Sequence, residues 1–266
     1  MTPVEVMRGD GPVVLGMPHT GTHVPPGILA RLTPLGRTLA DTDWHVGRLY
    51  DGLLAGVTIV RATFHRYVID ANRPPDGASL YPGQTTTGLV PVTDFDGLPL
   101  WEVNPAPDEI EARRRDFHVP YHTALAAEVE RVRARHGVAV LYDCHSIRSR
   151  IPFLFEGTLP DFNIGTNEGR SCAPEMEAAV ARLCADAEGY TSVLNGRFKG
   201  GWTTRHHGRP GAGVHAIQME LAQSTHLAAE ALPFAYDEGK AARLRLQLRA
   251  ILETLGDLAL SSRGSP

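Results

Sequence analysis

The sequence predicts an α/β fold: a single domain with a mostly parallel mixed sheet flanked by helices. Three observations favour this fold class. The 266 residues are 42% hydrophobic and 21% charged, which is ordinary for a globular chain that can bury a large core. Short apolar runs alternate with amphipathic helical periods. No repeat or linker divides the chain, so we expect one domain over residues 1–260 and a frayed polar tail at 261–266.

The predicted strands are short apolar runs rich in β-branched residues, which is typical of strands buried on both faces of a parallel sheet. Several of them end in polar residues whose side chains can bind a metal ion or act in catalysis. The runs lie at residues 13–17, 57–60, 138–142, 192–195 and 214–221.

The predicted helices follow from apolar side chains spaced three and four residues apart. Two clear periods cover residues 176–187 and 241–255, and a helix-like stretch covers 44–54. A third period, from about 108 to 136, contains Pro120, which lacks an N–H and is expected to break or kink a helix. We therefore expect two helices there.

Two segments have no clear period. Residues 72–107 are rich in proline and glycine, and long irregular segments of this kind commonly serve a site. Residues 195–208 combine glycine, hydroxyl and basic side chains, which suits a loop folded over a small anion. The phosphate-binding pattern GxxxxGK[ST] is missing, so a nucleotide site has little support.

Charge and composition argue against several partners. The 26 Lys and Arg residues against 30 Asp and Glu give a net charge of −4, so the chain has no overall cationic field for nucleic acid or anionic lipid. No apolar run approaches the roughly 18 residues of a membrane helix, and the N-terminus lacks the apolar region of a signal peptide. We predict a cytoplasmic protein with no nucleic-acid or membrane partner. A homo-oligomer is compatible with the sequence, and the three cysteines lack CxxC spacing.

Histidines stand at the ends of two predicted strands. His19 follows the first run, His145 follows the third, and Glu220 lies at the end of the last. Because ligands of open α/β sheets bind beyond the carboxyl ends of the strands, these side chains should converge. A catalytic zinc takes three nitrogen or oxygen ligands and keeps one position open, so His19 and His145 are expected to be two of the ligands.

A carboxylate near the next helix is the expected third ligand. Asp43 is favoured, although a helix N-cap is the competing role for it, and Asp41 and His45 remain alternatives. His23 is expected to be a loop residue because prolines follow it. The histidines without a partner pattern are expected at surface or satisfied core positions; they are His65, His118, His122, His136 and His226.

Several basic residues are candidates for binding an anionic substrate, because the arginine fork binds carboxylates with two parallel hydrogen bonds. Arg73 follows an alternating apolar run, Arg148 comes three residues after His145, and Lys199 and Arg205 lie in the glycine-rich segment. A cluster of surface charge is the competing interpretation for these residues.

Taken together, several strings resemble the N-formylglutamate amidohydrolase family over nearly the whole chain. The strings occupy residues 17–21, 41–45, 70–74, 143–149, 159–166, 194–201 and 218–223. The resemblance implies a fold similar to zinc carboxypeptidases and aspartoacylases. It also implies hydrolysis of N-formyl-L-glutamate, a small dicarboxylate, to L-glutamate and formate as the last step of a histidine degradation pathway.

The resemblance also implies roles for particular residues. Asn72 and Arg73 would hold the α-carboxylate of the substrate, and Glu220 would be the catalytic base. One zinc ion per chain, or another divalent metal, would be the cofactor. The His-x-x-Glu zinc pair of carboxypeptidases is absent, since Thr22 stands three residues after His19, so the carboxylate ligand must come from elsewhere.

Two points stay open. The second carboxylate of the substrate could be bound by Arg148, by Arg205 or by the segment around Lys199. A zinc hydrolase of another N-acyl amino acid would share the metal, Arg73 and Glu220, whereas a non-catalytic metabolite-binding protein would need only the arginines.

Overall fold

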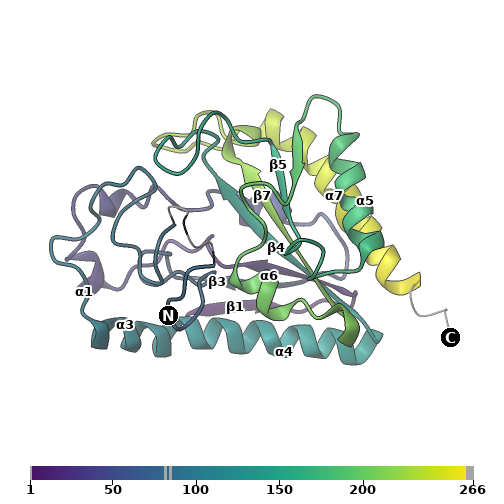
Figure 1. Ribbon diagram of the computed structural model, residues 1–266, viewed down its shortest axis with the longest axis horizontal. Coiled ribbons are helices and arrows are strands. Elements are labelled where there is room, and N and C mark those ends of the chain that lie inside the picture. Colours follow the sequence, from purple (N-terminus) through teal and green to yellow (C-terminus); the bar gives the residue numbers. More distant parts are fainter. Residues whose placement is uncertain (1, 81–82, 84–85, 262–266) are drawn as a thin grey trace.

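A computed structural model describes residues 2–80, 83 and 86–261. Within them the strands form one seven-stranded sheet in the order β1-β3-β2-β4-β7-β5-β6 (Figure 1). The strands are β1 (Val4–Met7), β2 (Val13–Met17), β3 (Thr58–Ala62), β4 (Ala139–Ile147), β5 (Phe162–Gly165), β6 (Ser192–Leu194) and β7 (Val214–Ala222).

The sheet is mixed and mostly parallel. Its centre, β3-β2-β4-β7, is parallel throughout, while β1 runs antiparallel to β3 and β5 runs antiparallel to β7. This confirms the predicted α/β fold class. The two strands that the sequence did not predict, β1 and β5, have four residues each, too few for a periodic pattern to stand out.

Helices cover both faces of the sheet, so alternate residues of a central strand enter different cores. In β2, Val13 and Leu15 pack in a cluster with α5 (Pro174–Ala185) and α7 (Glu238–Ser261), whereas Val14 packs with α4 (Val119–His136) on the other face. Figure 1 shows α4 along one side and α5 with α7 on the other. Burial on both faces explains the continuous apolar runs.

The helical stretch near Pro120 differs in detail from the expected break. The chain passes from α3 (Pro107–Arg113) through a π-helical segment (Arg114–His118) into α4, with Pro120 in the first turn of α4. A proline inside a helix removes one N–H donor and crowds the carbonyl four residues before it. The wider π winding accommodates this without ending the helix, and Figure 1 shows α3 and α4 in line.

A short helix, α6 (Trp202–His207), lies inside the segment predicted as a loop. No side chain of its own N-terminus caps it. Instead the backbone N–H of Thr203 donates to Oδ1 of Asn72, at 2.9 Å. A cap supplied from 131 residues away leaves no local signal, which is why the sequence pattern did not show this helix.

The remaining helices are short. They are α1 (Pro26–Leu29), α2 (Val46–Tyr50) and the 3₁₀ turns Gly36–Thr38, Pro210–Ala212 and Gln223–Thr225. Helix α2 is shorter than the predicted 44–54, and the described part of 72–106 contains no helix or strand, as expected. Helix α7 includes Ser261, and residues 262–266 of the predicted tail lie outside the described residues. Among the described helices, none is long and apolar enough to cross a membrane.

Candidate active site

The site lies at the carboxyl ends of three neighbouring parallel strands. His19 comes two residues after β2, and His145 and Glu220 lie near the ends of β4 and β7. The register of these two strands places His145 and Glu220 directly opposite each other. Strand order reverses at β2, which has β3 on one side and β4 on the other, and this is where ligands bind in open α/β sheets.

Three buried side chains form a candidate metal site. The ligand atoms of His19, Asp43 and His145 all lie within 4.8 Å of one another. Oδ2 of Asp43 is 3.2 Å from Nδ1 of His145 and 3.7 Å from Nδ1 of His19. The backbone N–H of Asp43 donates to the carbonyl of His19, so the segment before α2 is tied to the end of β2.

Asp43 does not act as the N-cap of α2. That position is occupied by His45, and no side chain caps this helix. The two alternative ligands also point elsewhere: Asp41 accepts a hydrogen bond from the backbone N–H of Phe95, and Nε2 of His45 lies 2.9 Å from the carbonyl of Phe234.

In both histidine rings Nδ1 faces Asp43, and the outer nitrogen, Nε2, contacts another carboxylate. Nε2 of His19 is 2.7 Å from Oδ1 of Asp70, and Nε2 of His145 is 3.1 Å from Oδ1 of Asp143. A carboxylate on the outer nitrogen is the usual second contact of a metal-binding histidine and leaves the other nitrogen for the ion. Nδ1 of His19 is buried without a hydrogen-bond partner and lies 3.7 Å from Oδ2 of Asp43, so these residues fit a cation between them.

The charges at the site are unusually dense. Burial alone would raise the pKa of Asp43, but the neighbouring imidazoles of His145 and His19 lower it. Burial alone would lower the pKa of His145, but Asp143 and Asp43 hold it well above its usual range. Burial would also raise the pKa of Asp70, which His19 and the Arg66 guanidinium hold well below its usual value. Asp43 and Asp143 thus favour positive charge at the His145 imidazole.

Glu220 faces the same space in a different environment. Burial raises its pKa to about 7, against the lowering effect of His145. Oε2 of Glu220 accepts a hydrogen bond from the side-chain amide of Gln218, at 3.0 Å. A carboxyl group with a pKa near neutrality can both accept and return a proton, which is what a general base requires.

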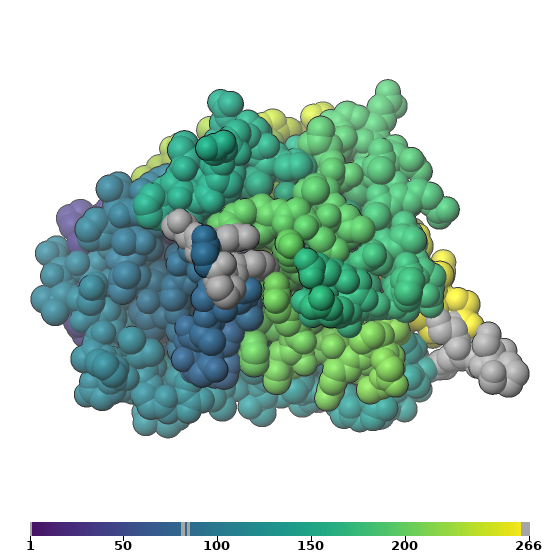
Figure 2. Space-filling model, in the orientation of Figure 1, coloured from purple at the N-terminus to yellow at the C-terminus, as the bar shows by residue number. Residues whose placement is uncertain are grey.

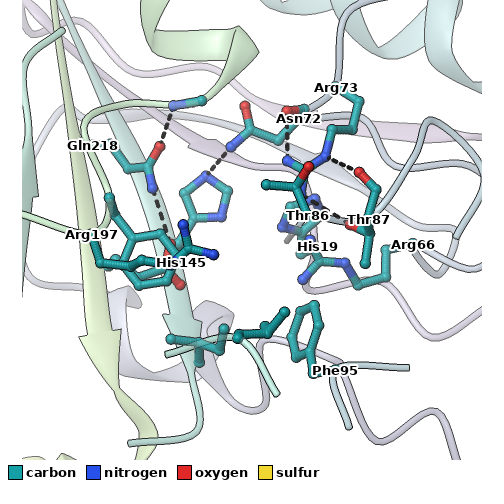
Figure 3. A pocket seen from close by; sticks show the side chains of 15 residues that line it. His19, Arg66, Asn72, Arg73, Thr86, Thr87, Phe95, His145, Arg197 and Gln218 are labelled. Atoms are coloured by element: carbon teal, nitrogen blue, oxygen red, sulfur yellow. Dashed lines mark hydrogen bonds between the residues drawn. The ribbon is translucent and has the colours of Figure 1, made fainter. Parts of the chain in front are cut away.

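These residues border a cavity of about 70 Å³ (Figure 3). In this view Arg73 and Arg197 lie on opposite sides, with the His145 ring between them. In Figure 2 the blue segment that follows β3 and the green segment around α6 adjoin on the face in view. The lining residues are His19, Arg66, Asn72, Arg73, Thr86, Thr87, Phe95, His145, Ile147, Leu154, Arg197, Phe198, Gly201, Gln218 and Glu220.

Comparison with known proteins shows the family of the chain. Residues 11–227 match the model of the N-formylglutamate amidohydrolase family. The chain belongs to this family. It is 49% identical over 251 residues to an N-formylglutamate deformylase of Pseudomonas aeruginosa, covering 93% of this chain and 94% of the relative. It is 45% identical to one of Pseudomonas putida, with 93% of each chain covered.

A solved structure supports the same grouping. The crystal structure of N-formylglutamate amidohydrolase from Ralstonia eutropha superposes with a TM-score of 0.81 at 25% identity, and the match covers 100% of both chains. A protein of Agrobacterium tumefaciens at 20% identity has a TM-score of 0.73, covers 100% and 97% of the two chains, and shows the shared fold alone. Family membership makes the protein an amidohydrolase.

In this amidohydrolase the predicted binding residues occupy two kinds of position. Asn72 and Arg73 line the cavity. Arg148, Lys199 and Arg205 are not among the lining residues that the structure describes. Arg148 pairs with Asp96, Lys199 pairs with Glu168, and Nε of Arg205 donates to the carbonyl of Gly200.

Two arginines that the sequence did not single out do line the amidohydrolase cavity. Arg66 is buried, pairs with Asp70 at 2.8 Å, and lies 3.8 Å from Asp43. Arg197 follows β6, within the glycine-rich segment already expected to bind an anion. One signal in the sequence could have drawn attention to Arg66. It lies four residues before Asp70, and Asp70 begins one of the strings that resemble the family.

Proposed function

We propose that this protein hydrolyses N-formyl-L-glutamate to L-glutamate and formate, as the last step of a histidine degradation pathway. The observation that carries the proposal is the meeting, at one cavity, of a histidine-carboxylate group, a glutamate with a near-neutral pKa and arginines from two sides. The names of the Pseudomonas relatives support the same substrate.

His19, Asp43 and His145 would hold one zinc ion. Two imidazoles and one carboxylate form a donor set that zinc prefers in catalytic sites, and the unpartnered Nδ1 of His19 favours a metal ligand over a structural role. When bound there, zinc would supply an activated water and Lewis-acid polarisation of the formyl group. Asp70 orients the ring of His19 through a hydrogen bond at Nε2, and Asp143 forms an ion pair with Nε2 of His145, at 3.1 Å.

Glu220 acts as the general base. It accepts a proton from the attacking water and returns that proton to the leaving nitrogen as the formyl C–N bond breaks. Its place opposite His145 in the sheet register sets it beside the metal ligands, and the Gln218 amide fixes the orientation of its carboxylate.

The arginines select a dicarboxylate. Three of the five N–H groups of Arg73 are used, by the Thr87 carbonyl, the Thr87 hydroxyl and the Asn72 carbonyl. In the described contacts this leaves one N–H on each terminal nitrogen, the pair that binds a carboxylate with two hydrogen bonds. We assign the α-carboxylate to Arg73 and the second carboxylate to Arg197, because Arg148, Lys199 and Arg205 do not line the cavity.

A substrate panel tests this function. The zinc-loaded protein is assayed on N-formyl-, N-acetyl- and N-succinyl-L-glutamate and on N-formyl amino acids without a second carboxylate. We expect the highest kcat/KM for N-formyl-L-glutamate. A higher value for another acyl group would identify a hydrolase of a different N-acyl amino acid. Binding without turnover of any of these compounds would identify a metabolite-binding protein.

A further inference from the structure

A second group of imidazoles lies beside the cavity, where the start of α4 meets α6. His118 and His122 are four residues apart, and their ring centroids are 4.5 Å apart. The ring of His122 stacks on that of His207 in α6, at 5.8 Å. Neither His118 nor His122 lines the cavity, so the proposed mechanism does not use them directly.

Both rings bind the main chain on either side of Asn72. Nε2 of His118 lies 3.0 Å from the carbonyl oxygen of Arg73, and Nε2 of His122 lies 2.7 Å from that of Ala71. A carbonyl oxygen can only accept, so each Nε2 carries the proton and donates. Burial lowers the pKa of both rings, which are therefore neutral donors at pH 7.

Residues 71–73, which the two rings hold, make further contacts at the site. The side-chain amide nitrogen of Asn72 is 3.1 Å from Nε2 of His145, and its Oδ1 accepts the Thr203 N–H. The next residue, Arg73, lines the cavity. The segment belongs to no strand or helix, so the carbonyls of Ala71 and Arg73 have no ladder partner. The two histidine rings take the place of a neighbouring strand, because each donates a hydrogen bond to one of these carbonyls.

We infer that His118, the last residue of the π-helical segment, and His122 of α4 are positioning residues, which hold residues 71–73 so that Arg73 meets the substrate carboxylate. The inference rests on the proposed function, because it assigns Arg73 to substrate binding. Small displacements of a binding group are costly in an enzyme, since the substrate must be held in one orientation for reaction.

The test compares a variant that loses the donor with one that keeps it. His122→Leu preserves bulk without an N–H, whereas His122→Gln keeps a side-chain N–H near the position of Nε2. We expect His122→Leu to raise KM for N-formyl-L-glutamate about 10-fold, with zinc content unchanged and kcat within about 3-fold, and His122→Gln to recover most of the loss. His136→Leu is the matched control, because Nε2 of His136 contacts the Asp10 carbonyl at the far end of the same helix.

Two further measurements keep the inference falsifiable. If His122→Leu does not fold, the pair His118→Leu and His118→Gln makes the same comparison at the Arg73 carbonyl. Combining the leucine variant with Arg73→Lys should raise KM by less than the product of the single effects, because both act on one interaction. An unchanged KM in the leucine variants, or glutamine variants as impaired as the leucine ones, would overturn the inference. Lack of wild-type turnover would instead overturn the proposed function.

Discussion

The two halves of the cavity are built from different kinds of structure. In the proposed metal half, His145 and Glu220 lie within adjacent strands of the central sheet, and His19 comes directly after a third. In the proposed carboxylate half, Arg73 and Arg197 lie on irregular segments, one after Asn72 and one after β6.

This difference determines how each half is kept in place. The backbone ladder of the sheet fixes the separation of His145 and Glu220, whatever their side chains contact. Arg73 lies outside the sheet, and its guanidinium is held by the carbonyl and hydroxyl of Thr87. We therefore expect changes in the metal half to reduce the chemical step, and changes in the carboxylate half to reduce substrate binding.

The largest effect is expected from removing a metal ligand. His145→Ala should lose its zinc and reduce kcat/KM by about 1,000-fold or more, because the site loses one of three ligands and leaves Asp143 and Asp43 without their partner. Elemental analysis and activity with added zinc measure both effects. His23→Ala, four residues after His19, should keep a full equivalent of zinc.

Asp43→Asn and Asp41→Asn separate the two candidate carboxylate ligands. We expect only Asp43→Asn to lose zinc, because Asp41 is turned toward the backbone of Phe95. If His145→Ala retained a full equivalent of zinc with wild-type activity, the metal site would be misplaced.

The next largest effect is expected at Glu220. Glu220→Gln preserves shape but cannot accept a proton, so kcat should fall roughly 100-fold to 10,000-fold while zinc is retained. Because the free carboxyl group has a pKa of about 7 and works in its ionised form, wild-type kcat/KM should decline as the pH falls below about 7. A variant with unaltered kcat would show that another residue is the base.

The same contrast explains what the sequence could predict. The prediction of His19, His145 and Glu220 depends on apolar strands, which are recognisable in the sequence, and on the rule that ligands bind at the strand ends. Asp43 is predicted because a catalytic zinc needs a third ligand, and the structure brings this side chain close to the two histidines. These inferences needed only local patterns and one rule about sheets.

The cationic residues of the cavity are harder to predict. In a segment without helical or strand periodicity, the sequence does not indicate which way a charged side chain points. Arg148 and Arg197 look alike in sequence, yet Arg148 pairs with Asp96 outside the cavity and Arg197 lines it. Helix α6 was missed for a similar reason, since its cap comes from Asn72. Contacts between distant segments decide such features.

Arg73→Lys tests the carboxylate half most directly. A point charge would replace a fork at constant net charge, so kcat/KM should fall roughly 10-fold to 150-fold, mainly through KM. An N-formyl amine without the α-carboxylate should be cleaved poorly, and almost equally, by wild type and variant. Equal impairment on both substrates would mean that Arg73 holds the site together and does not bind a carboxylate.

A smaller effect should separate Arg197 from Arg148. Arg197→Lys is expected to raise KM for N-formyl-L-glutamate about 10-fold, because the second carboxylate loses its fork. Arg148→Lys should change KM less than about 2-fold, since its partner Asp96 is outside the cavity and surface ion pairs contribute little. The opposite ranking would return the second carboxylate to Arg148.

The smallest effect is expected at Thr87, which touches Arg73 and also lines the cavity. Thr87→Val keeps the shape of the side chain and the carbonyl contact to Nε, but removes the hydroxyl that accepts from the guanidinium at 2.9 Å. The planar guanidinium then loses one of the contacts that fix its orientation, so KM should rise about 2-fold to 10-fold with kcat unchanged. Thr87→Ser, which keeps the hydroxyl, should stay close to wild type. A fall in kcat with KM unchanged would show that this loop serves the chemical step, and the division between the two halves of the cavity would fail at that point.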